Sequence, residues 1–350
     1  MTFKSINLSL SIAVIFLLSI SILVIYSSSP QLAFNQLIFA AIGILIYFFI
    51  SQFDYKAMKN LIVPLYIIIV LFLLFLAIVG VEVRGVIRWI PLLFFNFQPA
   101  EIAKPISALF LAYFWTRNAP SWFNIFKSFL IISPAVFLIF IQPALGSALA
   151  IIGLWLSLLI AIRVSLKKIL TLGIIVLTVL PLVWFTLQDY QKLRVLSFLS
   201  PQTDPLGHGY NLIQSTIAVG SGQLFGKGLG FGTQSRFQFL PEGRTDFIFA
   251  SIAEEFGFLG ALFLIGVYFL LISYCFKVAH NCEDFFGYLL TIGISSMLTF
   301  QIFVNIGMNI GLLPITGITL PLVSYGGSSL ISTMISLGLV ASVAKFSLKY

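Results

Sequence analysis

The stretch "LSLSIAVIFLLSISILVIY", residues 8–26, contains no charged side chain. A helix rises about 1.5 Å per residue, so this run nearly crosses a hydrocarbon core about 30 Å thick. No A-x-A cleavage pattern follows it, so we expect a membrane span rather than a signal peptide. The whole chain agrees, because 60% of its residues are hydrophobic, 9% are charged and its mean hydropathy is +1.10. Soluble chains carry about 25% charged residues, so we predict an integral membrane protein.

Nine further apolar segments follow the first one. They predict an all-α, polytopic membrane fold with about ten transmembrane helices, in a single membrane domain covering residues 1–350. The predicted helices run over residues 8–26, 31–50, 60–80, 99–116, 126–142, 145–162, 168–187, 246–276, 285–310 and 319–343. A long extracytoplasmic loop, about residues 188–245, separates the seventh helix from the eighth, and it is too long to serve only as a connection between two helices.

The positive charges indicate how the chain is oriented. With the N-terminus inside, eleven Lys and Arg residues fall on the cytoplasmic side and seven on the outer side, while Lys104 lies within a span. This bias favours cytoplasmic N- and C-termini. The net charge of +8 does not indicate a nucleic-acid partner, because most of these residues stand singly at helix ends. The outer charges gather in segments 81–98 and 188–245, which mark the functional side.

Several kinds of chemistry are excluded by missing motifs. The sequence contains no P-loop, H-E-x-x-H or G-x-S-x-G pattern. Cys275 and Cys282 indicate neither a zinc site nor a disulfide framework. The glycine-rich run "AVGSGQLFGKGLGFG", residues 218–232, lacks the strand and spacing of a nucleotide loop. It is either a flexible loop at the membrane surface or an anion-binding nest of backbone N–H groups with Lys227.

Two groups of ionisable residues at membrane depth are functional candidates. Glu101 and Lys104 are three residues apart, so one helix face carries both, as a structural ion pair or a catalytic pair. In "FLPEGRTDFIF", residues 239–249, Asp246 lies where an apolar helix begins. It is either a simple anion at a helix N-terminus or a general base beside Glu242 and Arg244.

These features narrow the function to two classes. A basic, glycine-rich outer loop and a second basic outer segment lie above carboxylates in the membrane. Interfacial cations suit a ligand with a phosphate head group and an apolar tail. The protein is therefore predicted to be an enzyme that acts on a lipid phosphate, or a transporter of one.

Six motifs resemble those of the SEDS family of peptidoglycan glycosyltransferases, which includes RodA, FtsW and SpoVE. They stand in family order from residue 84 to residue 330 and so cover most of the chain. They are "RGVIRWI", "FQPAEIAKP", "QPALGSAL", "DPLGHGYNLIQSTIAVGSGQLFGKGLGFGTQ", "FLPEGRTDFIFASIAEEFGFLG" and "GLLPITGITLPLVSYGGSSL". The sequence of residues 210–235 is most similar to that of the RodA members of the family.

The resemblance implies polymerisation of lipid II, an undecaprenyl-diphosphate-linked substrate, into β-1,4 glycan strands. The reaction takes place on the outer face of the bacterial cytoplasmic membrane, for cell elongation and shape. Asp246 matches the family's essential aspartate and is the expected catalytic base of an inverting transfer. Cations would stabilise the leaving diphosphate, and the candidates are Arg84, Arg88, Lys227 and Arg244. Further substrate-binding candidates are Trp89, Glu101, Lys104, Gln142, Glu242, Ser324 and Tyr325.

The resemblance also indicates partners and leaves some points open. A class B penicillin-binding protein should supply transpeptidation, alongside other membrane proteins of the elongation complex. No cofactor is required, although Mg²⁺ or Mn²⁺ assistance to the diphosphate stays open. Ala144 stands where the family carries Asp, so either this position is dispensable here or the activity is altered. The alternatives to the polymerase are a lipid II flippase and a non-catalytic scaffold of the elongation machinery, and Ala144 makes the scaffold more plausible. Likewise, "LPLVSYGGSS", residues 320–329, either breaks a helix or lines the cavity.

Overall fold

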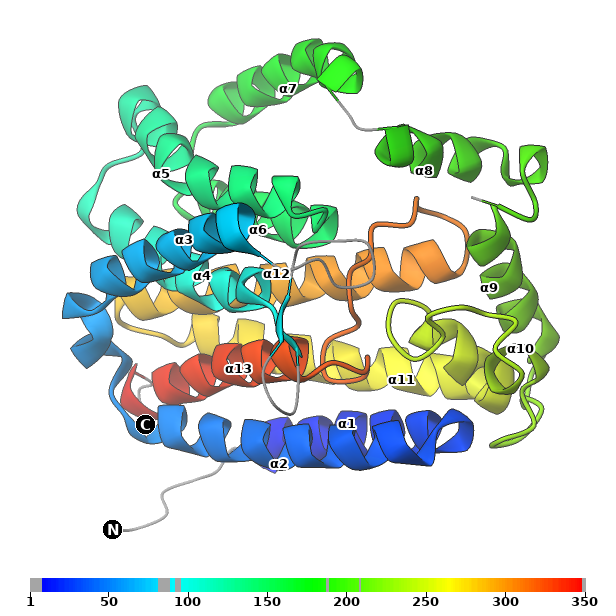
Figure 1. The fold of residues 1–350 in the computed structure, drawn as a ribbon. Helices are drawn as coiled ribbons and strands as arrows, with labels where there is room; N and C mark the ends of the chain where they lie inside the picture. Colours follow the sequence, from blue (N-terminus) through cyan, green and yellow to red (C-terminus); the bar gives the residue numbers. More distant parts are fainter. Residues whose placement is uncertain (1–7, 81–88, 92–95, 187–188, 208, 348–350) are drawn as a thin grey trace.

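In the part of the chain that the structure describes, ten long helices follow one another in the predicted order. The computed structural model describes residues 8–80, 89–91, 96–186, 189–207 and 209–347. The long helices are α1 (Leu8–Ser28), α2 (Pro30–Gln52), α3 (Ile62–Val79), α4 (Pro99–Arg117), α5 (Trp122–Ile141), α6 (Leu145–Ala161), α7 (Leu166–Thr186), α11 (Ile248–His280), α12 (Phe285–Asn309) and α13 (Gly327–Ser347). The predicted all-α fold is confirmed (Figure 1).

Shorter elements occupy the connections. They are η1 (Tyr55–Asn60), α8 (Asp189–Leu199), η2 (Pro201–Thr203), α9 (Tyr210–Ser221), α10 (Thr233–Arg236) and the paired strands β1 (Ile90–Pro91) and β2 (Asn96–Phe97). Within the described residues, seven helices are long and apolar enough to cross a membrane, namely α1, α2, α3, α5, α11, α12 and α13. The count of ten crossings stays a prediction. The last helix begins at Gly327 and not at residue 319, which corrects the sequence-based boundary.

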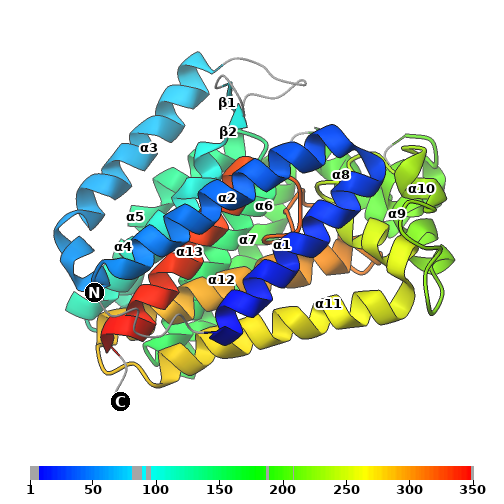
Figure 2. The ribbon, with the colours of Figure 1, turned by 90° about the horizontal axis from the view of Figure 1, so that it is seen from below.

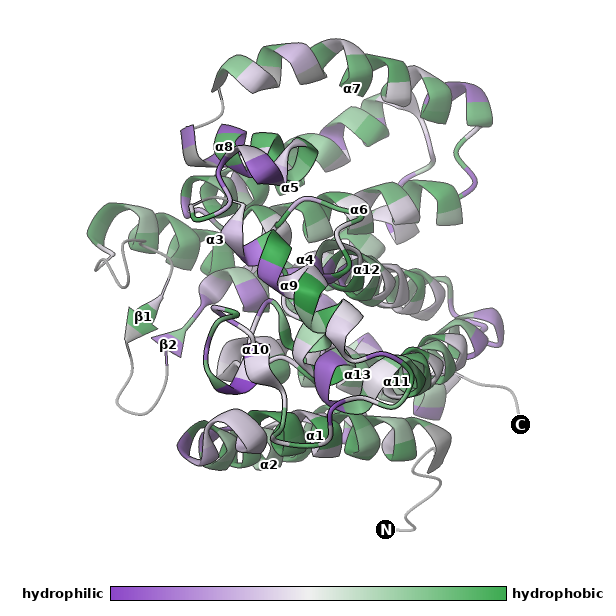
Figure 3. Ribbon diagram, turned by 90° about the vertical axis from the view of Figure 1, so that its right-hand side faces the viewer, coloured by the Kyte–Doolittle hydropathy of each residue, from purple (hydrophilic) through white to green (hydrophobic). Residues whose placement is uncertain are grey.

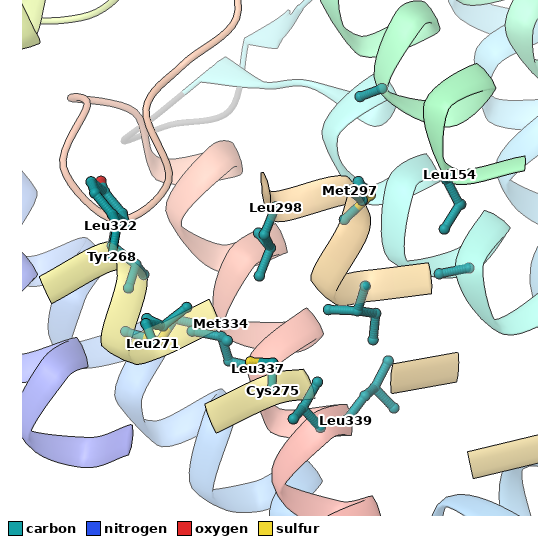
Figure 4. Packing of buried hydrophobic residues seen from close by; sticks show 14 of the residues in the cluster. Leu154, Tyr268, Leu271, Cys275, Met297, Leu298, Leu322, Met334, Leu337 and Leu339 are labelled. Carbon is teal, nitrogen blue, oxygen red and sulfur yellow. The ribbon is translucent and has the colours of Figure 1, made fainter. Parts of the chain in front are cut away.

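Helix α13 lies in the middle of the bundle and packs against α2, α4 and α12 (Figures 1 and 2). Small residues permit this closeness. A Cβ added at Gly43 of α2 would lie 2.6 Å from Leu330 Cδ2. Met334, which also lies next to Gly43, and Leu337 meet Leu271 and Cys275 of α11 (Figure 4). This central packing fixes the ends of α11, α12 and α13 relative to one another.

Helix α7 stands apart from this bundle (Figures 1 and 3). Its apolar side chains are exposed around the helix, with Ile174 61%, Leu177 69% and Phe185 79% exposed. The helices are hydrophobic along most of their length, and polar residues gather in the connecting segments (Figure 3). A helix that exposes apolar side chains on all sides belongs in lipid, not in water.

The two ends of the bundle differ. At one end, the Tyr55 hydroxyl donates to Asp284 Oδ2 at 3.0 Å, and Cys282 Sγ lies 2.9 Å from Ser347 Oγ. Burial raises the pKa of the Cys282 thiol, so it stays protonated and is a poor nucleophile. The opposite end carries α9, α10 and the turn that contains Asp246 (Figure 1). This second end holds the candidate site.

Candidate active site

Asp246 lies in a tight turn immediately before α11. The backbone N–H groups of Thr245 and Phe247 both donate to the carbonyl of Glu242, at 3.0 and 3.1 Å. Glu242 has a φ of +54°, and its exposed carboxylate accepts a hydrogen bond from Thr245 Oγ1 at 2.7 Å. These hydrogen bonds within the turn therefore stabilise its conformation. The Glu242 side chain serves the turn, and its contact with substrate stays a prediction.

Two buried amides of α12 hold the main chain of Asp246. Asn305 Nδ2 and Asn309 Nδ2 donate to the Asp246 carbonyl at 2.9 and 3.0 Å. Asn305 Nδ2 also donates to the carbonyl of Ile318 at 2.7 Å, and Asn309 Oδ1 accepts from the N–H of Ala250 at 3.0 Å. Both asparagines are fully buried. We call this pair the asparagine clamp, and it fixes Asp246 relative to the loop after α12.

The Asp246 side chain is half-buried and lies next to that loop. A Cβ added at Gly317 would lie 3.6 Å from Asp246 Oδ2, and Gly317 has a φ of +72°. Because residue 317 is a glycine, it places no side chain of its own beside the carboxylate.

The loop between α12 and α13, residues 310–326, is tied directly to the turn. Ser324 Oγ donates to the Thr245 carbonyl at 2.6 Å and accepts from the Leu320 N–H at 2.7 Å. The N–H of Tyr325 donates to the Arg244 carbonyl at 2.9 Å. Ser324 is buried, so its hydroxyl positions the turn, whereas the half-buried Tyr325 remains a substrate candidate. The motif "LPLVSYGGSS", residues 320–329, therefore interrupts the helix and also contributes hydrogen bonds that position the site.

Arg244 is anchored to the end of α1. Its Nε donates to Ser28 Oγ at 2.8 Å, and its Nη2 donates to the Ser28 carbonyl at 2.9 Å. The guanidinium keeps further donors, and the side chain is only half-buried. Arg244 thus positions the turn, and its contact with a diphosphate stays a prediction.

Lys227 binds a carboxylate of the chain itself. Its Nζ lies 2.9 Å from Glu254 Oε1. Glu254 is fully buried and also accepts from the N–H groups of Gln234 and Ser235, at 3.0 Å each. Backbone N–H groups do meet an anion beside Lys227, but they belong to Gln234 and Ser235, outside the predicted run 218–232, and the anion is Glu254 of the chain itself. Binding of a substrate phosphate by Lys227 stays a prediction that this ion pair does not support.

The glycine-rich run, residues 218–232, packs against a break in α11. Gly257 interrupts the helix with a φ of 68° and a ψ of −167°, and the Phe258 N–H donates to the Gln223 carbonyl at 2.7 Å. A Cβ added at Gly226 would lie 2.2 Å from the carbonyl oxygen of Glu255. The glycines thus permit close approach of two backbones, so the segment is neither a nucleotide loop nor a free connection.

We expect Lys227→Met to lower the free energy of unfolding by about 1–3 kcal/mol, because it removes a charged partner from a buried carboxylate. The melting temperature in detergent measures this effect. Adding Glu254→Gln to the variant should recover part of the loss, since the unpaired charge then disappears. Unchanged stability with a strong loss of substrate binding would instead assign Lys227 to the diphosphate.

Glu101 and Lys104 form a buried ion pair in α4. Lys104 Nζ lies 2.7 Å from Glu101 Oε2, and Ser147 Oγ donates to Glu101 Oε1 at 3.2 Å. The Ser332 hydroxyl donates to the Glu101 carbonyl at 2.6 Å, which links α4 to α13. These contacts give the pair a structural role, and its contact with substrate stays a prediction.

The remaining candidates are less informative. Gln142 is buried and its Nε2 donates to the Leu73 carbonyl at 2.8 Å. Ala144 occupies the N-cap position of α6 without a side-chain cap. Trp89 is half-buried beside β1. Arg84 and Arg88 lie outside the described residues, so their predicted roles rest on sequence alone.

The comparisons with known proteins decide the family. A model described as cell cycle protein, FtsW/RodA/SpoVE, matches residues 1–349. The chain belongs to the FtsW/RodA/SpoVE family. This confirms the resemblance inferred from its motifs and shows a multi-pass membrane protein.

Curated members of the family match along nearly their full length. The chain is 40% identical over 333 residues to "Peptidoglycan glycosyltransferase MrdB" of Escherichia coli strain K12, covering 93% of this chain and 90% of that protein. It is 35% identical over 360 residues to "Stage V sporulation protein E" of Bacillus subtilis, covering 97% of each.

Solved structures of the family agree with the fold. A chain from "Structural coordination of polymerization and crosslinking by a peptidoglycan synthase complex" matches with a TM-score of 0.85 and 31% identity, over 98% of both chains. The Thermus thermophilus rod shape determining protein RodA matches with a TM-score of 0.75 and 28% identity, over 100% of both chains.

Proposed function

We propose that the chain is a peptidoglycan glycosyltransferase that polymerises lipid II into β-1,4 glycan strands on the outer face of the cytoplasmic membrane. Residues 1–350 would form one membrane domain with both termini in the cytoplasm. One observation carries the proposal. The main chain of Asp246, whose carboxylate is half-buried, is held by a fully buried asparagine clamp in a chain that is 40% identical to a protein named as this enzyme.

In the proposed reaction, Asp246 accepts the proton of the acceptor's GlcNAc 4-hydroxyl. The oxygen attacks the anomeric carbon of the growing chain's MurNAc, and the bond from that carbon to the diphosphate oxygen breaks. The electron pair leaves with undecaprenyl diphosphate, and the configuration inverts from α to β. The asparagine clamp supports this role because a general base must be held within hydrogen-bond reach of its proton.

Cationic groups would stabilise the departing diphosphate. Lys227 and Arg244 are engaged with Glu254 and Ser28, so Arg84 and Arg88 become the stronger candidates. In the part of the chain that the structure describes, no group of three or more His, Cys, Asp or Glu side chains could hold a metal ion. We therefore assign no step of the reaction to a metal ion.

A transpeptidase partner fits this proposal. A solved relative comes from work on a peptidoglycan synthase complex that coordinates polymerisation and crosslinking. We propose that a class B penicillin-binding protein joins this chain together with other elongation-complex membrane proteins.

The deciding experiment incubates purified protein with lipid II and analyses the product by size. Glycan strands are expected, either from the chain alone or after addition of its penicillin-binding protein partner. Vesicles that contain lipid II provide the contrast. Transfer of lipid II across their bilayer without any polymer would support the flippase instead, and neither product would support the scaffold.

A further inference from the structure

An exposed apolar surface lies beside the break in α11. Six large hydrophobic side chains within sixteen residues are 42–78% exposed, and we call them the apolar patch: Leu224, Phe225, Leu229, Phe231, Phe237 and Phe239. The rings of Phe237 and Phe239 lie 6.3 Å apart, so part of the patch packs on itself. Single exposed apolar residues are ordinary, whereas a contiguous group marks a lipid or protein contact.

The break in α11 places this patch at the edge of the hydrocarbon. The apolar part of the helix after the break, Phe258–Phe276, covers nineteen residues before Lys277, and at about 1.5 Å per residue it nearly spans a core about 30 Å thick; the helix itself ends at His280. Phe258 and Phe263 are 59% and 58% exposed, as expected for lipid-facing side chains. Gly257 therefore lies close to the level at which the hydrocarbon ends.

The patch is continuous with that lipid-facing surface. The N–H of Leu259, itself 48% exposed, donates to the carbonyl of Leu224 at 3.1 Å. Leu224 and Phe225 thus lie alongside the first lipid-facing residues of α11. The two surfaces meet without an intervening polar segment.

The charges of the loop also fit a membrane surface. Residues 222–240 contain no Asp or Glu and two cations, Lys227 and Arg236. Lys227 is neutralised by Glu254, while Arg236 is exposed, with its Nη1 donating to the Gly230 carbonyl at 3.0 Å. An exposed arginine among aromatic side chains suits anionic lipid head groups.

We propose that residues 224–239 insert the apolar patch into the interfacial region of the outer leaflet and so form a membrane anchor. The anchor directly precedes the catalytic turn in the chain, and the buried Leu240 between them donates its N–H to the Gln234 carbonyl at 3.0 Å. Insertion would thus set the height of Asp246 relative to the leaflet that contains a lipid-linked substrate. The proposed membrane anchor is distinct from the glycosyl-transfer reaction, and its test requires no enzyme activity.

The test measures immersion depth with nitroxide labels on the full chain, in which Cys275 and Cys282 are replaced by serine. Separate proteins carry the label at Phe231→Cys or Phe237→Cys, so that misfolding of one leaves the other informative. They are reconstituted in vesicles of phosphatidylethanolamine and phosphatidylglycerol. Collisions with oxygen, which concentrates in the bilayer, are compared with collisions with a water-soluble nickel chelate.

Two further positions calibrate the scale, namely Gln202→Cys on an exposed polar segment of the same end and Phe263→Cys on the lipid-facing side of α11. The ratio of oxygen to nickel collisions at 231 and 237 is expected to exceed that at 202 by about threefold or more, toward the value at 263. A ratio equal to that at 202 would overturn the proposal. Low collision rates with both reagents would also overturn it, because protein would then cover the patch.

Discussion

Asp246→Asn is expected to lower the rate of lipid II polymerisation about 10²–10⁴-fold, the range that positioned acid–base groups contribute. An amide has nearly the shape of the carboxylate but does not accept the proton of the attacking hydroxyl. The asparagine clamp contacts the main-chain carbonyl of Asp246, so it should persist in the variant. The melting temperature is therefore expected to stay within about 2 °C of the unmodified protein.

The matched control for this prediction is Asp189→Asn. Asp189 is an aspartate in the first turn of α8, with a side chain that is 97% exposed and a 4.0 Å contact to Lys192. Its replacement should leave the polymerisation rate within about twofold, because exposed ion pairs contribute little. If Asp246→Asn instead retained more than a tenth of the rate, Asp246 would be a helix-terminal anion and not the base.

The helical fold was predictable because most of the long helices are predominantly apolar runs. The boundary at 319 was wrong for a physical reason. Residues 310–326 are as apolar as a span, yet Gly317 and Leu322 have positive φ values. Their segment stays buried because side chains satisfy its carbonyls, as Asn305 does for Ile318 and Ser21 does for Val323. Hydropathy does not distinguish such a loop from a helix.

The site was only partly predictable. Asp246 stood out because a carboxylate at the edge of the hydrocarbon is costly, but the clamp was missed inside the apolar stretch "IFVNIGMN", residues 302–309. Two amides four residues apart on one face of a span were the available signal. Lys227 was assigned to a substrate phosphate because its acceptor, Glu254, lies 27 residues further along the chain. Local spacing does not reveal such a pairing.

Asn305→Leu is expected to lower kcat about 10²-fold with little change in KM, because misplacing a catalytic group by about 1 Å costs roughly this much. The change removes both donors that join the Asp246 carbonyl to the Ile318 carbonyl. Asn305→Asp should be at least as damaging, since it places a carboxylate against two carbonyl oxygens. Polymerisation kinetics with varied lipid II concentration measure both constants.

Gln301→Leu separates this positioning role from general disruption of α12. Gln301 lies one helical turn before Asn305 and is 2% exposed, and its Nε2 has no hydrogen-bond partner among the described residues. Replacing an unpaired buried amide by an apolar side chain of similar size should be neutral or stabilising. We therefore expect this variant to keep both its kcat and its melting temperature. An equal loss of kcat in both leucine variants would contradict the clamp, because any apolar change in this part of α12 would then impair the enzyme.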